Sequence, residues 1–180
     1  MGKINGCSTV VSRVIQGMKV GDVDSVLQVI KAYMSGVPYD AEEQNELHYK
    51  TIVYCVFSLA TPYLTRCEEK SAAGRCDVVV ETADAVYMFE FLFKPSEAPN
   101  VFGHFRGDKN ALDQNGQVQF KLDGNGTAEQ AIKQIEGKGY LIPYTASFAA
   151  DGSPKKLFKI GVCIDTKKRT LGDWKIVEGS

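Results

Sequence analysis

The chain has 180 residues, of which 44% are hydrophobic and 24% charged, and its formal net charge at pH 7 is −1. This size and composition suit one globular domain with a sizeable core. The near-neutral charge excludes the overall basic surplus typical of proteins that hold nucleic acid mainly through phosphate contacts. Residues 1–17 lack the apolar core of a signal peptide, and the five cysteines contain no CxxC pair. We therefore expect a cytoplasmic protein without a membrane span, disulfide framework or zinc finger.

The first part of the chain predicts helices. Residues 1–18 show no clear periodicity, but residues 22–34 place apolar side chains at helical spacing, with Asp22 or Asp24 near the N-cap. Residues 41–60 predict a longer helix whose second half is apolar nearly all round and must be buried. The inner face of the first helix is expected to consist of Val23, Val26, Leu27, Ile30 and Met34.

From residue 63 onward the pattern becomes that of a β-sheet. A loop or hairpin is expected at 95–117, which is rich in Gly, Asn, Asp and Pro, and a helix capped by Thr127 should run to about Glu136. This order of elements predicts an α/β fold with a mixed sheet and helices packed on it. The strands are expected at 63–67, 75–81, 86–94, 117–122, 156–165 and 174–177.

The hairpin at 75–94 carries two acids inside apolar strands. A turn centred between Ala83 and Asp84 sets Asp77 opposite Glu90, with Cβ atoms about 5 Å apart on one side of the sheet. Two buried carboxylates there repel each other unless one is protonated, a basic group pairs with them, or a cation lies between them. A divalent metal ion with oxygen ligands would suit the pair. A turn one residue longer would instead send one acid to solvent.

Four ordered pieces of the sequence are similar to the PD-(D/E)xK nuclease superfamily. They are Asn45-Glu46-Leu47-His48-Tyr49, Gly74-Arg75-Cys76-Asp77, Phe89-Glu90-Phe91, and the run from Ala131 to Tyr140 that contains Gln134-Ile135 and Lys138. The combination resembles the branch found C-terminal to ATPase-like domains in bacterial proteins. It implies a domain at 40–180 with a restriction-endonuclease-like mixed β-sheet flanked by helices. Residues 1–39 would be a helical lead-in segment.

One position departs from this pattern. The family has a lysine two residues beyond the second acid, where this chain has Leu92. Lys121, in Phe120-Lys121-Leu122, would restore it if residues 92–119 are an inserted hairpin or loop whose ends lie close together. Lys94 has the right face parity but lies about 13 Å further along the strand, so Lys121 is preferred. If neither lysine reaches the acids, the site is inactive.

The resemblance implies roles for five residues. Asp77 and Glu90 would bind Mg²⁺ (or Mn²⁺), with Glu46 as a further metal ligand. Lys121 would orient or activate the attacking water, and Gln134 would approach the site from the last helix. Glu46 could equally pair with Lys50 one turn on, and Gln134 could equally face solvent.

Three functions compete at this point. The first is a Mg-dependent nuclease that hydrolyses phosphodiester bonds in DNA. The second is a catalytically inactive, nuclease-derived module that binds DNA or a protein partner, and the third is an unrelated scaffold with structural acids. The expected partners are nucleic acid, an ATPase-like partner domain and, if the insertion is a dimerisation arm rather than a substrate clamp, a second copy of the chain. The basic residues of 155–175 are the best candidate for a patch that binds the nucleic-acid backbone.

Overall fold

The computed structural model describes residues 6–36, 46–60, 64–71, 74–94, 126–165 and 168–179. Its helices are α1 (Gly6–Val20), α2 (Val23–Ser35), α3 (Glu46–Leu59) and α4 (Ala128–Gly137), with a short 3-10 helix, η1 (Ile142–Tyr144). Its strands are β1 (Leu64–Ser71), β2 (Gly74–Glu81), β3 (Ala85–Phe93), β4 (Lys156–Asp165) and β5 (Thr170–Gly179). The strand predicted at 117–122, the loop at 95–117 and Lys121 lie outside the described residues.

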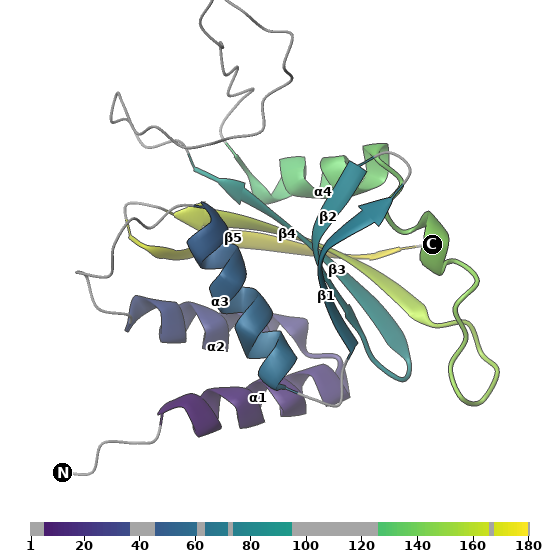
Figure 1. Cartoon of the computed structure of the whole chain (residues 1–180), viewed down its shortest axis with the longest axis horizontal. Helices are drawn as coiled ribbons and strands as arrows, with labels where there is room; N and C mark the ends of the chain where they lie inside the picture. Colours follow the sequence, from purple (N-terminus) through teal and green to yellow (C-terminus); the bar gives the residue numbers. More distant parts are fainter. Residues whose placement is uncertain are drawn as a thin grey trace, which may run out of the picture.

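The five strands form one mixed sheet in the order β1-β2-β3-β4-β5 (Figure 1). All neighbouring strands are antiparallel except β3 and β4, which run parallel. A parallel pair needs a crossover connection, and α4 lies in the connection between β3 and β4. The mixed sheet predicted from the sequence is therefore confirmed.

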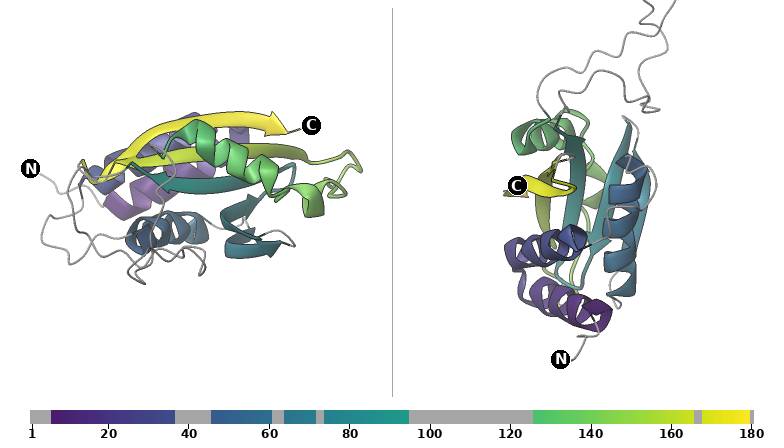
Figure 2. Two further views of the ribbon diagram at one scale, coloured as in Figure 1. Left: turned by 90° about the horizontal axis from the view of Figure 1, so that it is seen from above. Right: turned by 90° about the vertical axis from the view of Figure 1, so that its left-hand side faces the viewer.

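Helices cover both faces of the sheet (Figure 2). One hydrophobic cluster joins α1, α2 and α3 to one face, where the ring of Phe57 in α3 lies 5.1 Å from the ring of Phe89. A smaller cluster, which includes Met88 and Ile135, lies under α4 on the other face. Since consecutive residues of a strand point to opposite faces, Glu90 points to the face that α4 covers.

Two predicted helices are confirmed. The side chain of Asp22 accepts a hydrogen bond from Ser25 N at 3.1 Å and caps α2, whose five predicted inner-face residues are all buried. The apolar half of α3 is buried on one side only. Val53 and Phe57 are fully enclosed, whereas Leu59 is 58% exposed and Cys55 is exposed, so the prediction that this half is buried all round is wrong. None of the helices in the described residues is both long and apolar enough to cross a membrane.

The structure has a helix, α1, at residues where the sequence shows no clear periodicity and predicts no element. Val14 and Met18, one turn apart, are buried in the cluster shared by the first three helices. At Gly17 the helix approaches α2 so closely that a Cβ would lie 2.5 Å from Val26 Cγ2. Glycine weakens the local helical signal, and contacts with α2 and the sheet supply the stabilisation instead.

Both edge strands are longer than predicted. β1 runs to Ser71 rather than ending at Cys67, and β5 spans Thr170–Gly179 rather than 174–177. An edge strand gains backbone pairing on one side without burying a continuous apolar run. Its hydrophobic pattern therefore understates its length.

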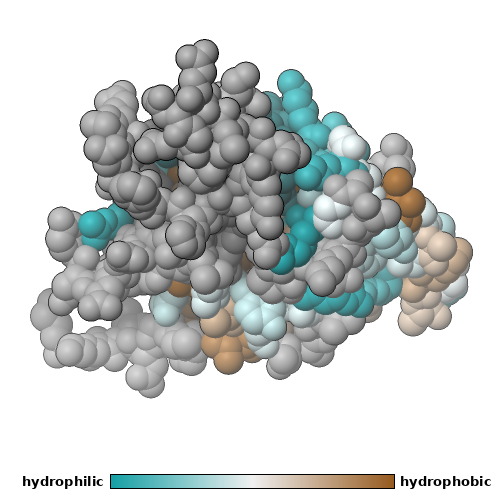
Figure 3. Space-filling view, turned by 45° about the horizontal axis from the view of Figure 1, so that its top comes forward, coloured by the Kyte–Doolittle hydropathy of each residue, from teal (hydrophilic) through white to brown (hydrophobic). Residues whose placement is uncertain are grey.

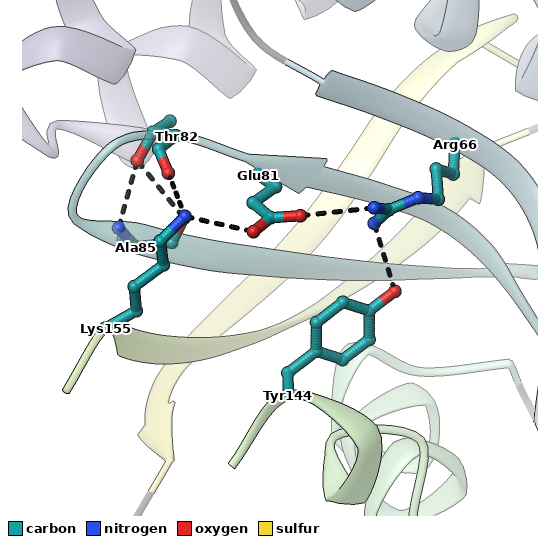
Figure 4. A network of polar contacts seen from close by, with 6 residues as sticks. All are labelled: Arg66, Glu81, Thr82, Ala85, Tyr144 and Lys155. Atoms are coloured by element: carbon teal, nitrogen blue, oxygen red, sulfur yellow. Dashed lines mark hydrogen bonds and ion pairs between the residues drawn. The ribbon is translucent and has the colours of Figure 1, made fainter. Parts of the chain in front are cut away.

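A network of ion pairs around Glu81 holds the turn end of the β2–β3 hairpin (Figure 4). Lys155 Nζ lies 3.0 Å from Glu81 Oε1 and donates to Thr82 O at 2.7 Å. Arg66 Nη2 lies 3.3 Å from Glu81 Oε2, and Arg66 Nη1 donates to the Tyr144 hydroxyl at 3.4 Å. Burial alone would raise the pKa of Glu81, but the hydrogen bond and charge of Lys155, with those of Arg66, hold it below its usual value. This end of the hairpin is therefore pinned to β1, to η1 and to the start of β4.

Replacing Glu81 with Gln should lower the free energy of unfolding near pH 7 by about 1 kcal/mol, because two partly buried ion pairs lose their anion. Since the folded pKa of Glu81 is depressed, its contribution is full above the unfolded pKa of about 4.3 and is lost as the pH falls through the folded value. Denaturant unfolding at a series of pH values should show the two proteins converging in acid. Glu178→Gln, at an exposed acid of β5, is the control. A difference that persists undiminished in acid would contradict this interpretation.

Candidate active site

The β2–β3 hairpin has the register predicted from its turn. The ladder pairs Glu81 with Val86 and continues to Val78 with Phe89, and Asp77 and Glu90 follow directly beyond its last pair. Both carboxylates are buried, with 6% and 3% of their residue surfaces exposed. The alternative of a longer turn that sends one acid to solvent is therefore wrong.

The side chain of Asp77 bonds to β3 where the backbone ladder stops. The ladder ends at the Val78–Phe89 pair, and one step further the backbone N–H of Phe91 donates to Asp77 Oδ2 at 2.9 Å. A hydrogen bond from a backbone N–H offsets part of the cost of burying a carboxylate. It also directs the Asp77 carboxylate toward the segment of β3 that carries Glu90.

Helix α4 lies directly beside Glu90 because a glycine permits the approach. Gly161 of β4 pairs with Glu90, and a Cβ at Gly161 would lie 2.1 Å from Ala128 O. Further along α4, Gln134 Nε2 donates a hydrogen bond to Glu90 Oε1. The structure thus brings Gln134 to Glu90, and the alternative that Gln134 simply faces solvent is wrong.

The start of α4 is set by local chemistry and by contact with the end of β3. Thr127 and Gln130 form a reciprocal capping box, with hydrogen bonds of 3.1 and 3.2 Å. Just before it, Gly126 packs so tightly that a Cβ would lie 2.3 Å from Phe93 O. The Cys163 thiol donates to Gly126 O at 2.9 Å. The chain therefore leaves the described sheet after β3 and returns in contact with the same strand end.

The described residues do not show which lysine accompanies Asp77 and Glu90. Leu92 continues β3 and pairs with Cys163, so the position two residues beyond Glu90 is occupied by a leucine. Lys94 follows the strand with an exposed side chain, and Lys121 lies outside the described residues. The preference for Lys121 over Lys94 stays a prediction.

Glu46 begins α3, but its side chain also lies outside the described residues. Val53 and Phe57, on the same stripe of the helix, are buried against the sheet face opposite α4. Whether Glu46 is a metal ligand or a partner of Lys50 stays a prediction.

Tyr140 and Cys76 lie close enough to the acids to feel their charge, although the sequence analysis assigned no role to either residue. Burial, followed by the charge of Glu90, raises the pKa of Tyr140 against the effect of hydrogen bonds from the Arg75 backbone and Gln134. Burial, followed by the charges of Glu90 and Asp77, raises the pKa of the Cys76 thiol. Both groups are therefore protonated at neutral pH. The one signal for Tyr140 was its place in the run from Ala131 to Tyr140, and Cys76 had none beyond its position next to Asp77.

The basic residues of 155–175 are largely paired with acids, which reduces their value as a phosphate-binding patch. The described surface that is visible in Figure 3 is mostly hydrophilic, with hydrophobic side chains at its right-hand edge and near its lower middle. The pairs are Lys155–Glu81 at 3.0 Å, Lys159–Glu136 at 2.5 Å, Lys175–Glu129 at 3.7 Å and Lys168–Asp165 at 3.9 Å.

Two buried carboxylates on adjacent strands are a donor set that suits a hard divalent cation. Mg²⁺ is usually held by one or two carboxylates and takes the rest of its octahedral shell from water and substrate phosphates. Within the described ranges, no group of three or more His, Cys, Asp or Glu side chains is arranged to hold a metal ion. Asp77 and Glu90 supply carboxylate ligands of the kind that a site completed by water and substrate would use.

A comparison with protein families shows which family part of the chain is similar to. Residues 44–114 match the family model of the PD-(D/E)XK nuclease superfamily. This segment is therefore similar to that superfamily. The match contains Asp77 and Glu90 and ends before α4, so it does not include Gln134 or Tyr140. No curated protein and no solved structure matches the chain.

The superfamily match confirms the resemblance and the fold class predicted from the sequence. The five-stranded mixed sheet with helices on both faces is an α/β fold consistent with a restriction-endonuclease-like domain. PD-(D/E)XK nucleases usually use divalent metal ions, which agrees with the donor set of Asp77 and Glu90. The narrower branch associated with ATPase-like domains stays a prediction.

Replacing Gly161 with Ala should lower the free energy of unfolding by about 1–3 kcal/mol, because the new Cβ would overlap Ala128 O and push α4 off the sheet. The control is Gly137→Ala in the same helix, where an added Cβ meets nothing within 4 Å. Chemical denaturation measures both. Equal stability of the two variants would show that α4 does not lie against β4 as described.

Proposed function

We propose that this chain is a nuclease that hydrolyses phosphodiester bonds in DNA with Mg²⁺ or Mn²⁺ held by Asp77 and Glu90. The observation that carries the proposal is the pair of buried carboxylates on neighbouring strands, within a segment that matches the model of a nuclease superfamily. Carboxylates in apolar strands are costly to bury, and an open divalent site gives them both compensation and a chemical use.

The bound cation would polarise the scissile phosphate and lower the pKa of a coordinated water. Asp77 would be kept in place for this by the backbone N–H of Phe91. Glu90 would be kept in place by Gln134, whose side-chain amide donates a hydrogen bond to Glu90 Oε1. Lys121 would orient the attacking water and stabilise negative charge that develops on phosphorus.

The long-range electrostatic attraction between this chain and DNA is expected to be weak. The net charge of −1 and the ion pairs of residues 155–175 provide little long-range attraction for a polyanion. Firm attachment to DNA would therefore come through a partner. The ATPase-like partner domain and a homodimer stay predictions of the sequence.

Asp77→Asn and Glu90→Gln should each reduce metal-dependent cleavage of DNA by about 100-fold or more, since each removes a ligand charge at nearly constant side-chain volume. Lys121→Ala should have a comparable effect if that lysine completes the site. Lys94→Ala, at an exposed position beyond β3, should change the rate by about 2-fold or less. Cleavage of single- and double-stranded DNA with Mg²⁺ or Mn²⁺, compared with EDTA, measures each rate.

Two other results would replace this proposal. If the wild type binds Mn²⁺ in calorimetry but leaves DNA uncut under a range of conditions, the chain is a nuclease-derived binding module, in line with Leu92 at the lysine position. If it binds no divalent metal, Asp77 and Glu90 are structural acids.

Replacing residues 95–125 with a short Gly-Ser linker should leave the described core folded, because Gly126 already lies against Phe93. The melting temperature should fall by no more than about 5 °C, and Mn²⁺ binding should persist. Cleavage should be lost together with Lys121. An unfolded product in circular dichroism would show that the replaced segment is part of the core rather than an insertion.

A further inference from the structure

Tyr140 is held in place independently of its hydroxyl group. It follows α4 through a tight turn in which Gly139 has a φ of 58°, and its backbone N–H donates to Ile135 O at 3.2 Å. Its ring is buried in the cluster under α4, with 2% of the residue surface exposed. Removing only the hydroxyl should therefore leave the packing of the ring unchanged.

The hydroxyl of Tyr140 lies where α4 meets the start of β2. Gly74 has a φ of 151°, which favours glycine, and a Cβ there would lie 3.0 Å from the Tyr140 hydroxyl and 3.2 Å from Lys138 Nζ. Hydrogen bonds with the Arg75 backbone and with the Gln134 side chain act to lower the pKa of this hydroxyl, against the stronger effect of burial. One oxygen atom thus links the strand of Asp77 to the helix of Gln134.

Gln134 in turn reaches Glu90 through its Nε2 atom. A side-chain amide held at one point can rotate and turn its oxygen toward the carboxylate, which would be repulsive. An amide held at two points keeps its N–H toward Glu90. These contacts run from the Arg75 backbone through Tyr140 and Gln134 to Glu90. They therefore connect the two strands that carry the acids.

We propose that Tyr140 is a positioning residue for the metal site, whose hydroxyl orients Gln134 and, through Gln134, the Glu90 carboxylate. This inference rests on the metal site of the proposed function. It concerns residues beyond the segment matched to the superfamily. Tyr140 itself need not touch metal or substrate.

The test compares Tyr140→Phe with Tyr144→Phe in the full chain. Tyr144 belongs to the same hydrophobic cluster, but its hydroxyl contacts Arg66 near the turn end of the hairpin. Mn²⁺ affinity is measured by calorimetry, and the melting temperature is measured in EDTA. Tyr140→Phe should weaken Mn²⁺ binding by about 10-fold or more, as expected for a residue that orients a ligand. Tyr144→Phe should leave the affinity within about 2-fold of wild type.

A double-mutant cycle with Gln134→Ala separates positioning from a general loss of structure. If Tyr140 acts through Gln134, Tyr140→Phe should have little further effect on Mn²⁺ affinity once Gln134 is Ala. Undiminished Mn²⁺ affinity in Tyr140→Phe, or an equal loss in both backgrounds, would overturn the inference while leaving the proposed function intact. A wild type that binds no Mn²⁺ would overturn both, and a wild type that binds Mn²⁺ without cutting DNA would overturn only the nuclease proposal.

Discussion

Burying two carboxylates on neighbouring strands is the constraint on which the rest of this site depends. Asp77 and Glu90 lose hydration worth several kcal/mol each and repel each other as anions. The chain supplies a directed donor to each: the backbone N–H of Phe91 to Asp77 and the amide of Gln134 to Glu90. These donors orient the two carboxylates. In the proposed metal site, a bound cation would offset the repulsion between them.

Glycine occupies the points of close approach around the two carboxylates. Gly161 lets α4 lie on the sheet beside Glu90, and Gly74 lets the Tyr140 hydroxyl meet the start of β2. Gly126 lets the returning chain pack against the end of β3. At each point an added methyl group would overlap other atoms or force them apart. The far end of the hairpin is held instead by the ion pairs of Glu81, so stability and candidate chemistry lie at opposite ends of the same two strands.

The candidate site was only partly predictable. The register that opposes Asp77 and Glu90 follows from a polar turn between two apolar strands, because a shift by one residue would reverse which side chains are buried. Gln134 was expected from the resemblance of its helix to the superfamily. Tyr140 and Cys76 were not expected as neighbours of the acids. Their proximity depends on how closely α4 packs on the sheet, and no local pattern encodes that distance.

For the fold as a whole, the sequence by itself determined the elements whose signals are local. These are the amphipathic helix α2 with its cap at Asp22, the hairpin of β2 and β3, the capping box at Thr127, and the buried strand β4. Tertiary structure alone decided that residues 6–20 form a helix, that β5 extends over ten residues, and that basic residues of 155–175 pair with acids on other elements. In each of these cases the stabilising partner lies far away in the sequence. Periodicity reports the burial of a segment's own face, whereas backbone pairing at an edge and ion pairing across elements exist only after the chain has folded.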